Sequence, residues 1–322
     1  MRIEQGGRVR HERAFGRTRD DAPALPCRVD SRFDLASLTK VFVGSVALDA
    51  VARGTLALDA PLTAFVPEWR DDEHEPIALR AILAHDAGFK SGADYRTLLD
   101  RDVEAFALRE PLAAPPGAQV IYSDLGFIAL GTILARAHGR ALAALVAERL
   151  RAWGAQTTAY GPAARDRAAI PATETDAWRG SVQGVVHDEK AYLLAGNAGH
   201  AGLFGTARDV AALGEWYLAA LHRRPTPLDP GLAREALREQ AWDPVLRRGL
   251  GWALKTTDEN SCGARMSAAT FGHTGFTGTA IWVDPERDLN VVLLTNAVHH
   301  GRVDIRAIRA AVCDAAVEAL DR

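Results

Sequence analysis

The sequence predicts an α+β fold, in which an antiparallel sheet is built from both ends of the chain, flanked by helices, and interrupted by a mostly helical inserted domain. One observation is a pair of strand-like segments around Gly6-Gly7, followed by a helix. Another is a tail of short strand-like runs that closes with a helix, and a third is the long middle section, where Pro and Gly clusters separate helical stretches. We expect a sheet domain of residues 1–55 and 225–322 and an inserted domain of residues 56–224.

The spacing of apolar residues predicts the individual elements in order. Residues 8–15 alternate loosely after the Gly-Gly turn, which indicates the second arm of a hairpin. From Ser37 onward the chain is apolar on more than one face, which predicts a helix that is buried on nearly all sides. Further helices are expected at 79–85, 125–138, 207–221 and 303–320, and strands at 249–256, 279–284 and 289–296.

Composition excludes several classes of protein. The 322 residues are 48% hydrophobic and 25% charged, enough to bury a large core. Lysine and arginine number 38 against 41 acidic residues, and no block of like charges is present, which argues against nucleic acid or an anionic membrane surface as a partner. The three cysteines are far apart and form no CxxC pair, so neither a disulfide framework nor a zinc ribbon is expected.

The first twenty residues are charged and contain no apolar run of the length that a signal peptide or membrane anchor requires. As written, the chain is therefore expected to be cytoplasmic and to have no membrane segment. A periplasmic or secreted location is expected instead if an N-terminal leader is missing.

Ser37 and Lys40 are the sharpest local signal, because a serine at the start of a buried helix is followed by a lysine about one turn later. Backbone N–H groups of a first helical turn are unpaired, and with the helix dipole they stabilise an anion at such a serine. Burial disfavours the charged form of a lysine and lowers its pKa, so that it can accept the serine proton. The two residues are therefore candidates for nucleophile and base.

The same pattern has a plainer explanation as chance plus a capping serine. With 8 serines and 4 lysines, about 0.1 S-x-x-K match is expected by chance. The chain contains 34 arginines, so each lysine hints at a requirement that arginine does not meet, such as loss of its proton.

Two further segments carry candidate chemistry. Tyr122 and Asp124 lie where a loop meets the start of a helix, and His273-Thr274-Gly275-Phe276 lies in a glycine-rich segment that runs into a strand. Glycines there permit close approach of a substrate, and an edge strand can supply an N–H group to an oxyanion. Taken singly, Tyr122 is explained as a packing ring, Asp124 as an N-cap and the glycines as a turn.

Taken in order, Ser37-x-x-Lys40, Tyr122-x-Asp124 and His273-Thr274-Gly275 resemble the three motifs of the serine β-lactamase and penicillin-binding protein superfamily. The similarity is greatest to the class C β-lactamase-like branch, which also holds D,D-carboxypeptidases, D-aminopeptidases and esterases, and it extends over most of the chain. The resemblance implies a β-lactamase-like fold with the active site in a cleft between the two domains.

The resemblance also implies a role for each matching residue. Ser37 resembles the acylated nucleophile, Lys40 its proton acceptor and Tyr122 a second proton-transfer group. The N–H groups of Ser37 and Phe276 would form the oxyanion hole. His273 stands where many members have lysine, and it would contact a substrate carboxylate or tune the protons of Tyr122 and Lys40.

Two departures from the family pattern affect these expectations. Asp124 stands where the middle motif usually has asparagine, so an amide donor is lost and a negative charge enters beside Lys40. That charge keeps Lys40 protonated or shifts the role of base toward Tyr122. In addition, the family pattern implies a longer first strand than residues 1–5 provide.

The sequence therefore predicts a serine hydrolase that forms an acyl-enzyme on Ser37 and needs no cofactor. Its substrate is a small molecule or peptide, namely a D-amino-acid peptide, an ester or a β-lactam, and the loss of the usual lysine at His273 favours the first two. A member that has lost catalysis and acts as a binding protein is the alternative. Scattered histidines such as His85, His187 and His200 lack metal-ligand spacing, so no metal is expected.

Overall fold

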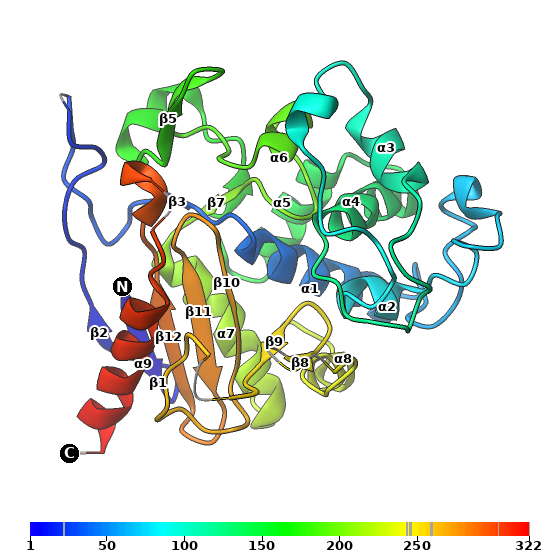
Figure 1. Ribbon diagram of the computed structural model, residues 1–322. Helices are drawn as coiled ribbons and strands as arrows, with labels where there is room; N and C mark the ends of the chain where they lie inside the picture. Colours follow the sequence, from blue (N-terminus) through cyan, green and yellow to red (C-terminus); the bar gives the residue numbers. More distant parts are fainter. Residues whose placement is uncertain (22, 243, 245–246, 258–259, 302, 322) are drawn as a thin grey trace.

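The computed structural model describes residues 1–21, 23–242, 244, 247–257, 260–301 and 303–321. Its main feature is a seven-stranded antiparallel sheet with the order β2-β1-β12-β11-β10-β9-β8 (Figure 1). The first strands of the chain lie beside the last one, which confirms a sheet built from both termini. Its strands are β1 (Arg2–Gln5), β2 (Arg8–Glu12), β8 (Arg247–Arg248), β9 (Ala253–Leu254), β10 (Phe271–Thr274), β11 (Ala280–Asp284) and β12 (Leu289–Leu293).

The two faces of this sheet are covered by α7 (Ala207–Leu221) and α9 (Arg306–Leu320), one on each side (Figure 1). Alternation along β11 explains how both faces are buried, because successive side chains of a strand point to opposite sides. Ile281 and Val283 join the main core, to which α7 contributes, whereas Ala280 and Trp282 pack in the cluster that includes residues of α9.

Helices α2 to α6 gather on one side of the molecule, with α1 (Leu38–Ala52) between them and the sheet, while α8 lies near β8 and packs on α7 (Figure 1). As predicted, α1 is buried on nearly all sides. The other helices are α2 (Leu79–Leu83), α3 (Val103–Arg109), α4 (Asp124–His138), α5 (Leu142–Ala152), α6 (Glu189–Leu193) and α8 (Pro230–Ala236), with 3-10 turns η1 (Pro67–Trp69), η2 (Tyr95–Thr97), η3 (Ala164–Ala169) and η4 (Ala297–His300).

Two small sheets were not expected from the sequence. One joins β3 (Phe33–Asp34), β7 (Leu203–Gly205) and β4 (Ala159–Tyr160), and the other joins β5 (Glu174–Asp176) and β6 (Gly180–Val182). Their strands are only two or three residues long, too short to show a period. The first of these sheets leads directly into α1 and therefore positions its N-terminus.

The predicted strand at 249–256 is shorter in the structure, where only β9 is extended. Gly251 has a φ of +78° and donates its N–H to the carbonyl of Leu83, which takes the chain out of the sheet at this point. The division into domains at residues 55 and 225 stays a prediction; α7, which falls within the predicted insert, packs on the large sheet. Among the described residues, no helix has the length and apolar character needed to span a membrane.

Candidate active site

The backbone that leads into α1 is held by Asp34, a buried residue at the end of β3. Its carboxylate accepts hydrogen bonds from the N–H of Ala36 at 2.8 Å and from the N–H of His187 at 2.6 Å. Ala36 has a φ of +45°, a left-handed conformation that is unfavourable for alanine. The two bonds to Asp34 thus hold a tight turn immediately before Ser37.

Ser37 and Lys40 face each other across the first turn of α1. The Lys40 ammonium donates to Ser37 Oγ at 3.1 Å, and the lysine is completely buried. Ser37 makes no side-chain capping bond to the helix, so its hydroxyl is not used as the ordinary cap that the sequence left open. The structure therefore brings together the predicted nucleophile and its neighbour.

The contacts of Lys40 decide between the two expectations for its charge. Its ammonium donates to Asp124 Oδ1 at 2.8 Å and to the His200 carbonyl at 3.2 Å. Burial alone would lower the pKa of Lys40, but the Asp124 carboxylate and the Tyr122 side chain outweigh it and raise the pKa above its ordinary value. Burial alone would favour a Lys40 that loses its proton readily, but the counter-charge of Asp124 favours a Lys40 that keeps it, which is the alternative that the sequence raised.

Tyr122 and Asp124 are placed by the start of α4. Ser123, and not Asp124, is the N-cap of this helix, because its hydroxyl accepts the N–H of Gly126 at 3.0 Å. The Ser123 N–H in turn donates to His85 Nδ1 at 3.0 Å, so His85 holds this turn. Capping by Ser123 leaves the Asp124 carboxylate available for Lys40.

The ring of Tyr122 is surrounded by cations and a histidine. The Lys40 ammonium lies 4.8 Å from the ring centroid and the Arg248 guanidinium carbon 5.3 Å from it. The rings of His85 and Tyr122 are 4.5 Å apart between centroids. Burial, followed by the charges of Arg248 and Lys40, keeps the pKa of His85 well below its usual range, so His85 adds no charge of its own.

Residues 273–276 comprise the last two residues of β10 and the first two of the turn after it, and they approach the start of α1. A Cβ on Gly275 would lie 2.1 Å from Thr279 Oγ1 and 2.7 Å from the Leu35 carbonyl oxygen, so only glycine fits here. The hydroxyl of Thr279 donates to that same carbonyl at 3.1 Å. Gly275 thus lets the two segments meet at Ser37.

His273 is a neutral residue in this site. Burial, followed by the charges of Lys40 and Arg248, lowers the pKa of His273 to about 3. Its Nδ1 lies 2.8 Å from the Thr274 carbonyl oxygen and therefore carries the proton. The buried Nε2 is left as an acceptor with no hydrogen-bond partner among the described residues. Both expected roles of His273, contact with a substrate carboxylate and tuning of the neighbouring protons, stay predictions.

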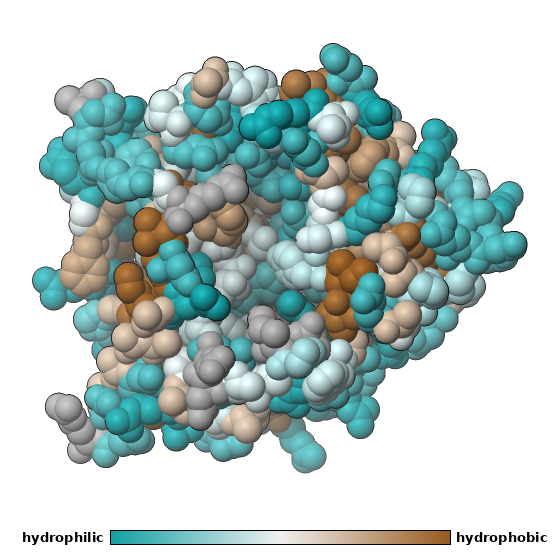
Figure 2. Space-filling view, viewed as in Figure 1, coloured by the Kyte–Doolittle hydropathy of each residue, from teal (hydrophilic) through white to brown (hydrophobic). Residues whose placement is uncertain are grey.

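These residues open onto one cavity of about 640 Å³. Its lining includes six of the eight predicted site residues: Ser37, Tyr122, His273, Thr274, Gly275 and Phe276. Lys40 and Asp124 lie behind this lining and reach the cavity through Ser37 and Tyr122. Figure 2 shows the same face of the molecule hollowed near its centre.

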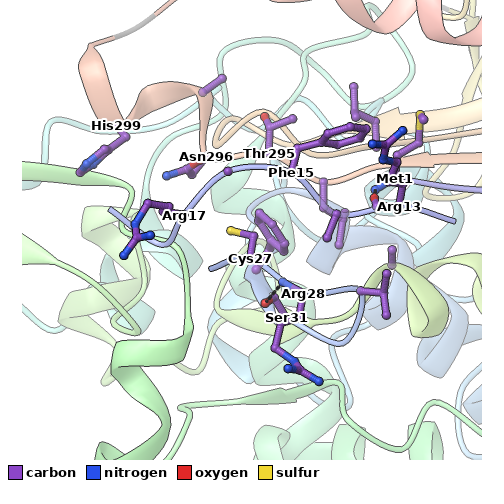
Figure 3. Close-up of a pocket in the computed structure, with 18 of the residues that line it drawn as sticks. Met1, Arg13, Phe15, Arg17, Cys27, Arg28, Ser31, Thr295, Asn296 and His299 are labelled. Atoms are coloured by element: carbon purple, nitrogen blue, oxygen red, sulfur yellow. Dashed lines mark hydrogen bonds between the residues drawn. The ribbon is translucent and has the colours of Figure 1, made fainter. Parts of the chain in front are cut away.

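A second cavity, of about 540 Å³, lies between the N-terminal segment and the end of β12. Figure 3 shows Arg17 and His299 at one end of it and Met1 and Arg13 at the other. It contains none of the predicted catalytic residues. The first cavity is therefore the candidate active site.

Several residues of the site were missed from the sequence. Asp188 and Lys190 continue the charged network beyond Asp124, and Arg248 and Arg309 line the cavity. Because the chain has only 4 lysines, Lys190 could have been singled out from the sequence. Nothing distinguishes Arg248 and Arg309 among the 34 arginines.

Two carboxylates and a histidine near Lys40 are close enough together to be possible metal ligands. The ligand atoms of Asp124, Asp188 and His200 lie within 4.8 Å of one another. The ammonium groups of Lys40 and Lys190 already bind the two carboxylates. We accordingly treat the group as an ion-pair network.

Comparison with known proteins identifies the family. The family model described as Beta-lactamase matches residues 2–314 of the chain. This chain belongs to the beta-lactamase family. Membership covers almost the whole chain, so it accounts for the sheet, the helical part and all three motifs together.

Named relatives of this beta-lactamase family member differ in their activities. It is 29% identical to an N-acetylmuramyl-L-alanine amidase of Bacillus subtilis, over 94% of this chain and 77% of that protein. It is 30% identical to esterase EstB of Burkholderia gladioli, over 93% of this chain and 86% of that protein. It is 29% identical to a putative D-alanyl-D-alanine carboxypeptidase of Escherichia coli K12, over 83% of this chain and 69% of that protein. The class C beta-lactamase structure from Rhodobacter sphaeroides shares the fold, with a TM-score of 0.77 at 19% identity, covering 100% of this chain and 94% of that one.

Proposed function

We propose that this protein hydrolyses acyl compounds through a covalent acyl-enzyme on Ser37. The observation that carries the proposal is the Lys40 ammonium 3.1 Å from Ser37 Oγ, at the wall of a cavity large enough for a small molecule. Relatives named as an amidase, an esterase and a carboxypeptidase all act on acyl bonds, which supports the same reaction class.

The proposed reaction has two halves. Ser37 Oγ attacks the substrate carbonyl while Tyr122 accepts the hydroxyl proton, since Asp124 keeps Lys40 charged. In this step Tyr122 accepts the proton as a phenolate. The Lys40 ammonium stabilises the negative charge of that phenolate before the transfer and the charge that develops on the serine oxygen during it. The acyl bond to the leaving group breaks, and the leaving group takes the proton from Tyr122. A water then gives its proton to Tyr122, attacks the acyl ester and releases the acid, and the proton returns to Ser37.

The N–H groups of Ser37 and Phe276 are proposed to stabilise the tetrahedral oxyanion. Support for this comes from the close contact at Gly275, which brings the segment before Phe276 against the backbone before Ser37. His273 is assigned as a hydrogen-bond acceptor at the cavity wall.

The preferred substrate carries a carboxylate near the acyl bond, as a peptide that ends in a D-amino acid does. Arg309 supports this preference, because it is buried at the cavity and its guanidinium binds the carbonyls of Gly275 and Thr279 rather than a carboxylate. We expect Arg309→Gln to raise KM about tenfold for a carboxylate-bearing peptide and to leave KM for a neutral ester within about twofold. Equal changes for both substrates would contradict the assignment.

The experiment compares hydrolysis of an N-acyl-D-alanyl-D-alanine, an aryl acetate and a penicillin by the wild type and by Ser37→Ala. We expect measurable turnover of at least one of them, reduced about 1,000-fold or more by the substitution. Turnover that survives in Ser37→Ala would exclude Ser37 as the nucleophile.

A binding protein with weak or lost catalysis is the second candidate. It is favoured by the charge on Lys40, which removes the base that the family pattern implies. In that case the wild type would bind a carboxylate-bearing peptide and hydrolyse none of the three substrates.

A further inference from the structure

Asp124 lies between two lysines from different parts of the chain. Its Oδ1 binds the Lys40 ammonium at 2.8 Å, and its Oδ2 lies 3.3 Å from the Lys190 ammonium. The side chain of Lys40 is fully buried and that of Lys190 is 11% exposed, so both ion pairs form away from bulk water. Ion pairs in such surroundings interact more strongly than those on the surface.

Lys190 is held in place from its own helix. Asp188 is the N-cap of α6, and its carboxylate accepts the N–H of Ala191 at 2.8 Å. The Lys190 ammonium donates to Asp188 Oδ2 at 3.1 Å, while His200 Nε2 contacts Asp188 Oδ1 at 2.8 Å. The ammonium therefore sits between two carboxylates, and α6 fixes its position.

We infer that Lys190 is a positioning residue of the Ser37 site. It binds Asp124 Oδ2 and thereby neutralises part of the negative charge that the Asp124 carboxylate presents to Lys40 through Oδ1. The inference rests on the proposed function for its catalytic consequence. Asp124 and Lys190 together thus take the place of the neutral asparagine side chain that the family pattern usually has beside Lys40.

The titratable groups that act on Asp124 come from several elements. They are Lys40 of α1, Lys190 of α6, Asp188 at the cap of α6, and His200 in the loop before β7. Burial would raise the pKa of Asp124, but Lys40 and His200 outweigh it and hold the pKa below its usual value. Loss of Lys190 would leave the whole carboxylate charge to act on the site around Lys40. A more negative site disfavours the loss of a proton from it, so catalysis would begin only at higher pH.

The first part of the test needs no substrate. The chain contains only four lysines, so protein labelled with 13C at the lysine Cε gives four side-chain signals, and that of Lys190 is identified by its loss in Lys190→Met. Burial would lower the pKa of Lys190, but the carboxylates of Asp188 and Asp124 outweigh it and raise the pKa above its ordinary value. Asp124→Asn should therefore lower the pH at which the Lys190 signal titrates. An unchanged titration would show that the two residues are not paired and would overturn the inference.

The second part measures kcat/KM against pH. Lys190→Met should move the ascending limb to higher pH and lower kcat/KM about tenfold at pH 7, whereas Lys190→Arg should restore it to within about threefold. In the Asp124→Asn background, Lys190→Met should change kcat/KM less than threefold. The control is Lys90→Met, because Lys90 pairs with Glu110 and is 43% exposed.

The outcomes separate this inference from the proposed function. Equal effects of Lys190→Met with and without Asp124 would overturn the positioning role. A wild type without Ser37-dependent turnover would overturn the proposed function and with it the catalytic role of Lys190, while the lysine titration would still report the ion pair. If Asp124→Asn does not fold, the pH profile of Lys190→Met and its rescue by Lys190→Arg decide the inference, and an unshifted profile overturns it.

Discussion

Lys40 has three oxygen acceptors around its ammonium group: Ser37 Oγ, Asp124 Oδ1 and the His200 carbonyl. A fully buried cation is tolerated when it is paired and hydrogen-bonded in this way. The same contacts decide the chemistry, because a lysine that keeps its proton stabilises a neighbouring anion and leaves proton transfer to Tyr122.

Replacing Asp124 by asparagine removes the charge that keeps Lys40 protonated. The folded-state pKa of Lys40 is raised, so loss of its partner lowers that pKa and Lys40 becomes a base at lower pH. We expect the ascending limb of kcat/KM to move down by about one pH unit or more in Asp124→Asn. The measurement is a pH–rate profile on the best of the three substrates.

Asp100→Asn is a matched control for this change, because Asp100 is exposed in the turn before α3. Its profile should coincide with that of the wild type. An Asp124→Asn profile that also coincides would mean that this carboxylate does not control the proton transfers.

The start of α1, the start of α4 and the end of β10 meet at the site, and glycine makes the last of these contacts possible. A Cβ at Gly275 would overlap Thr279 Oγ1 and approach the Leu35 carbonyl, while Ala36 already has a strained φ. The backbone before Ser37 is therefore fixed by neighbouring elements as well as by its own sequence.

Gly275→Ala should push β10 away from the start of α1 and lower kcat/KM about 100-fold or more, because small displacements of reacting groups are costly. Gly139→Ala, at a φ of +59° with no atom within 4 Å of its Cβ, is the control. That change should cost about 1 kcal/mol of stability and leave kcat/KM unchanged. Full activity in Gly275→Ala would refute the argument from close approach.

The sequence was a good guide to elements that have a clear period. The hairpin around Gly6-Gly7, the buried helix after Ser37 and the C-terminal strands and helix are all present in the structure. The short strands β3 and β7 were not predictable, because two or three residues show no period and their pairing joins segments about 170 residues apart.

The motifs predicted which residues gather at the site, and Asp124 in the middle motif already raised the possibility of a protonated Lys40. The positions of Ser37, Lys40 and Tyr122 followed from their order and context. The neutral state of His273 and the contact from Lys190 could not be predicted, because they depend on burial and on partners outside the three motifs.

For the whole molecule, the sheet and the helical part are joined at a core that contains a buried acid. Burial is the main reason that the pKa of Asp34 is raised to about 6, against bonds from His187 and Ala36 that favour the charged form. An acid whose pKa is raised in the folded state stabilises the fold most below its unfolded pKa, given as 3.8. That contribution is lost as the pH rises through about 6.

We expect the free energy of unfolding of the wild type to include a loss of about 2 kcal/mol between pH 4 and pH 7 that comes from Asp34. Asp34→Asn should be less stable overall, because an amide cannot accept both N–H groups, and should lack this part of the pH dependence. Urea unfolding at several pH values measures both effects. Parallel curves for the two proteins would contradict the prediction.

The most direct test of the account is the intact mass of the protein after rapid acid quench of a reaction with an aryl acetate, and separately with a penicillin. We predict a mass increase equal to the acyl group or the opened drug with at least one of them, mapped to the peptide that contains Ser37 and absent in Ser37→Ala. An unmodified protein together with unchanged substrates, or an adduct that persists in Ser37→Ala, would contradict the claim that Ser37 is the acylated nucleophile.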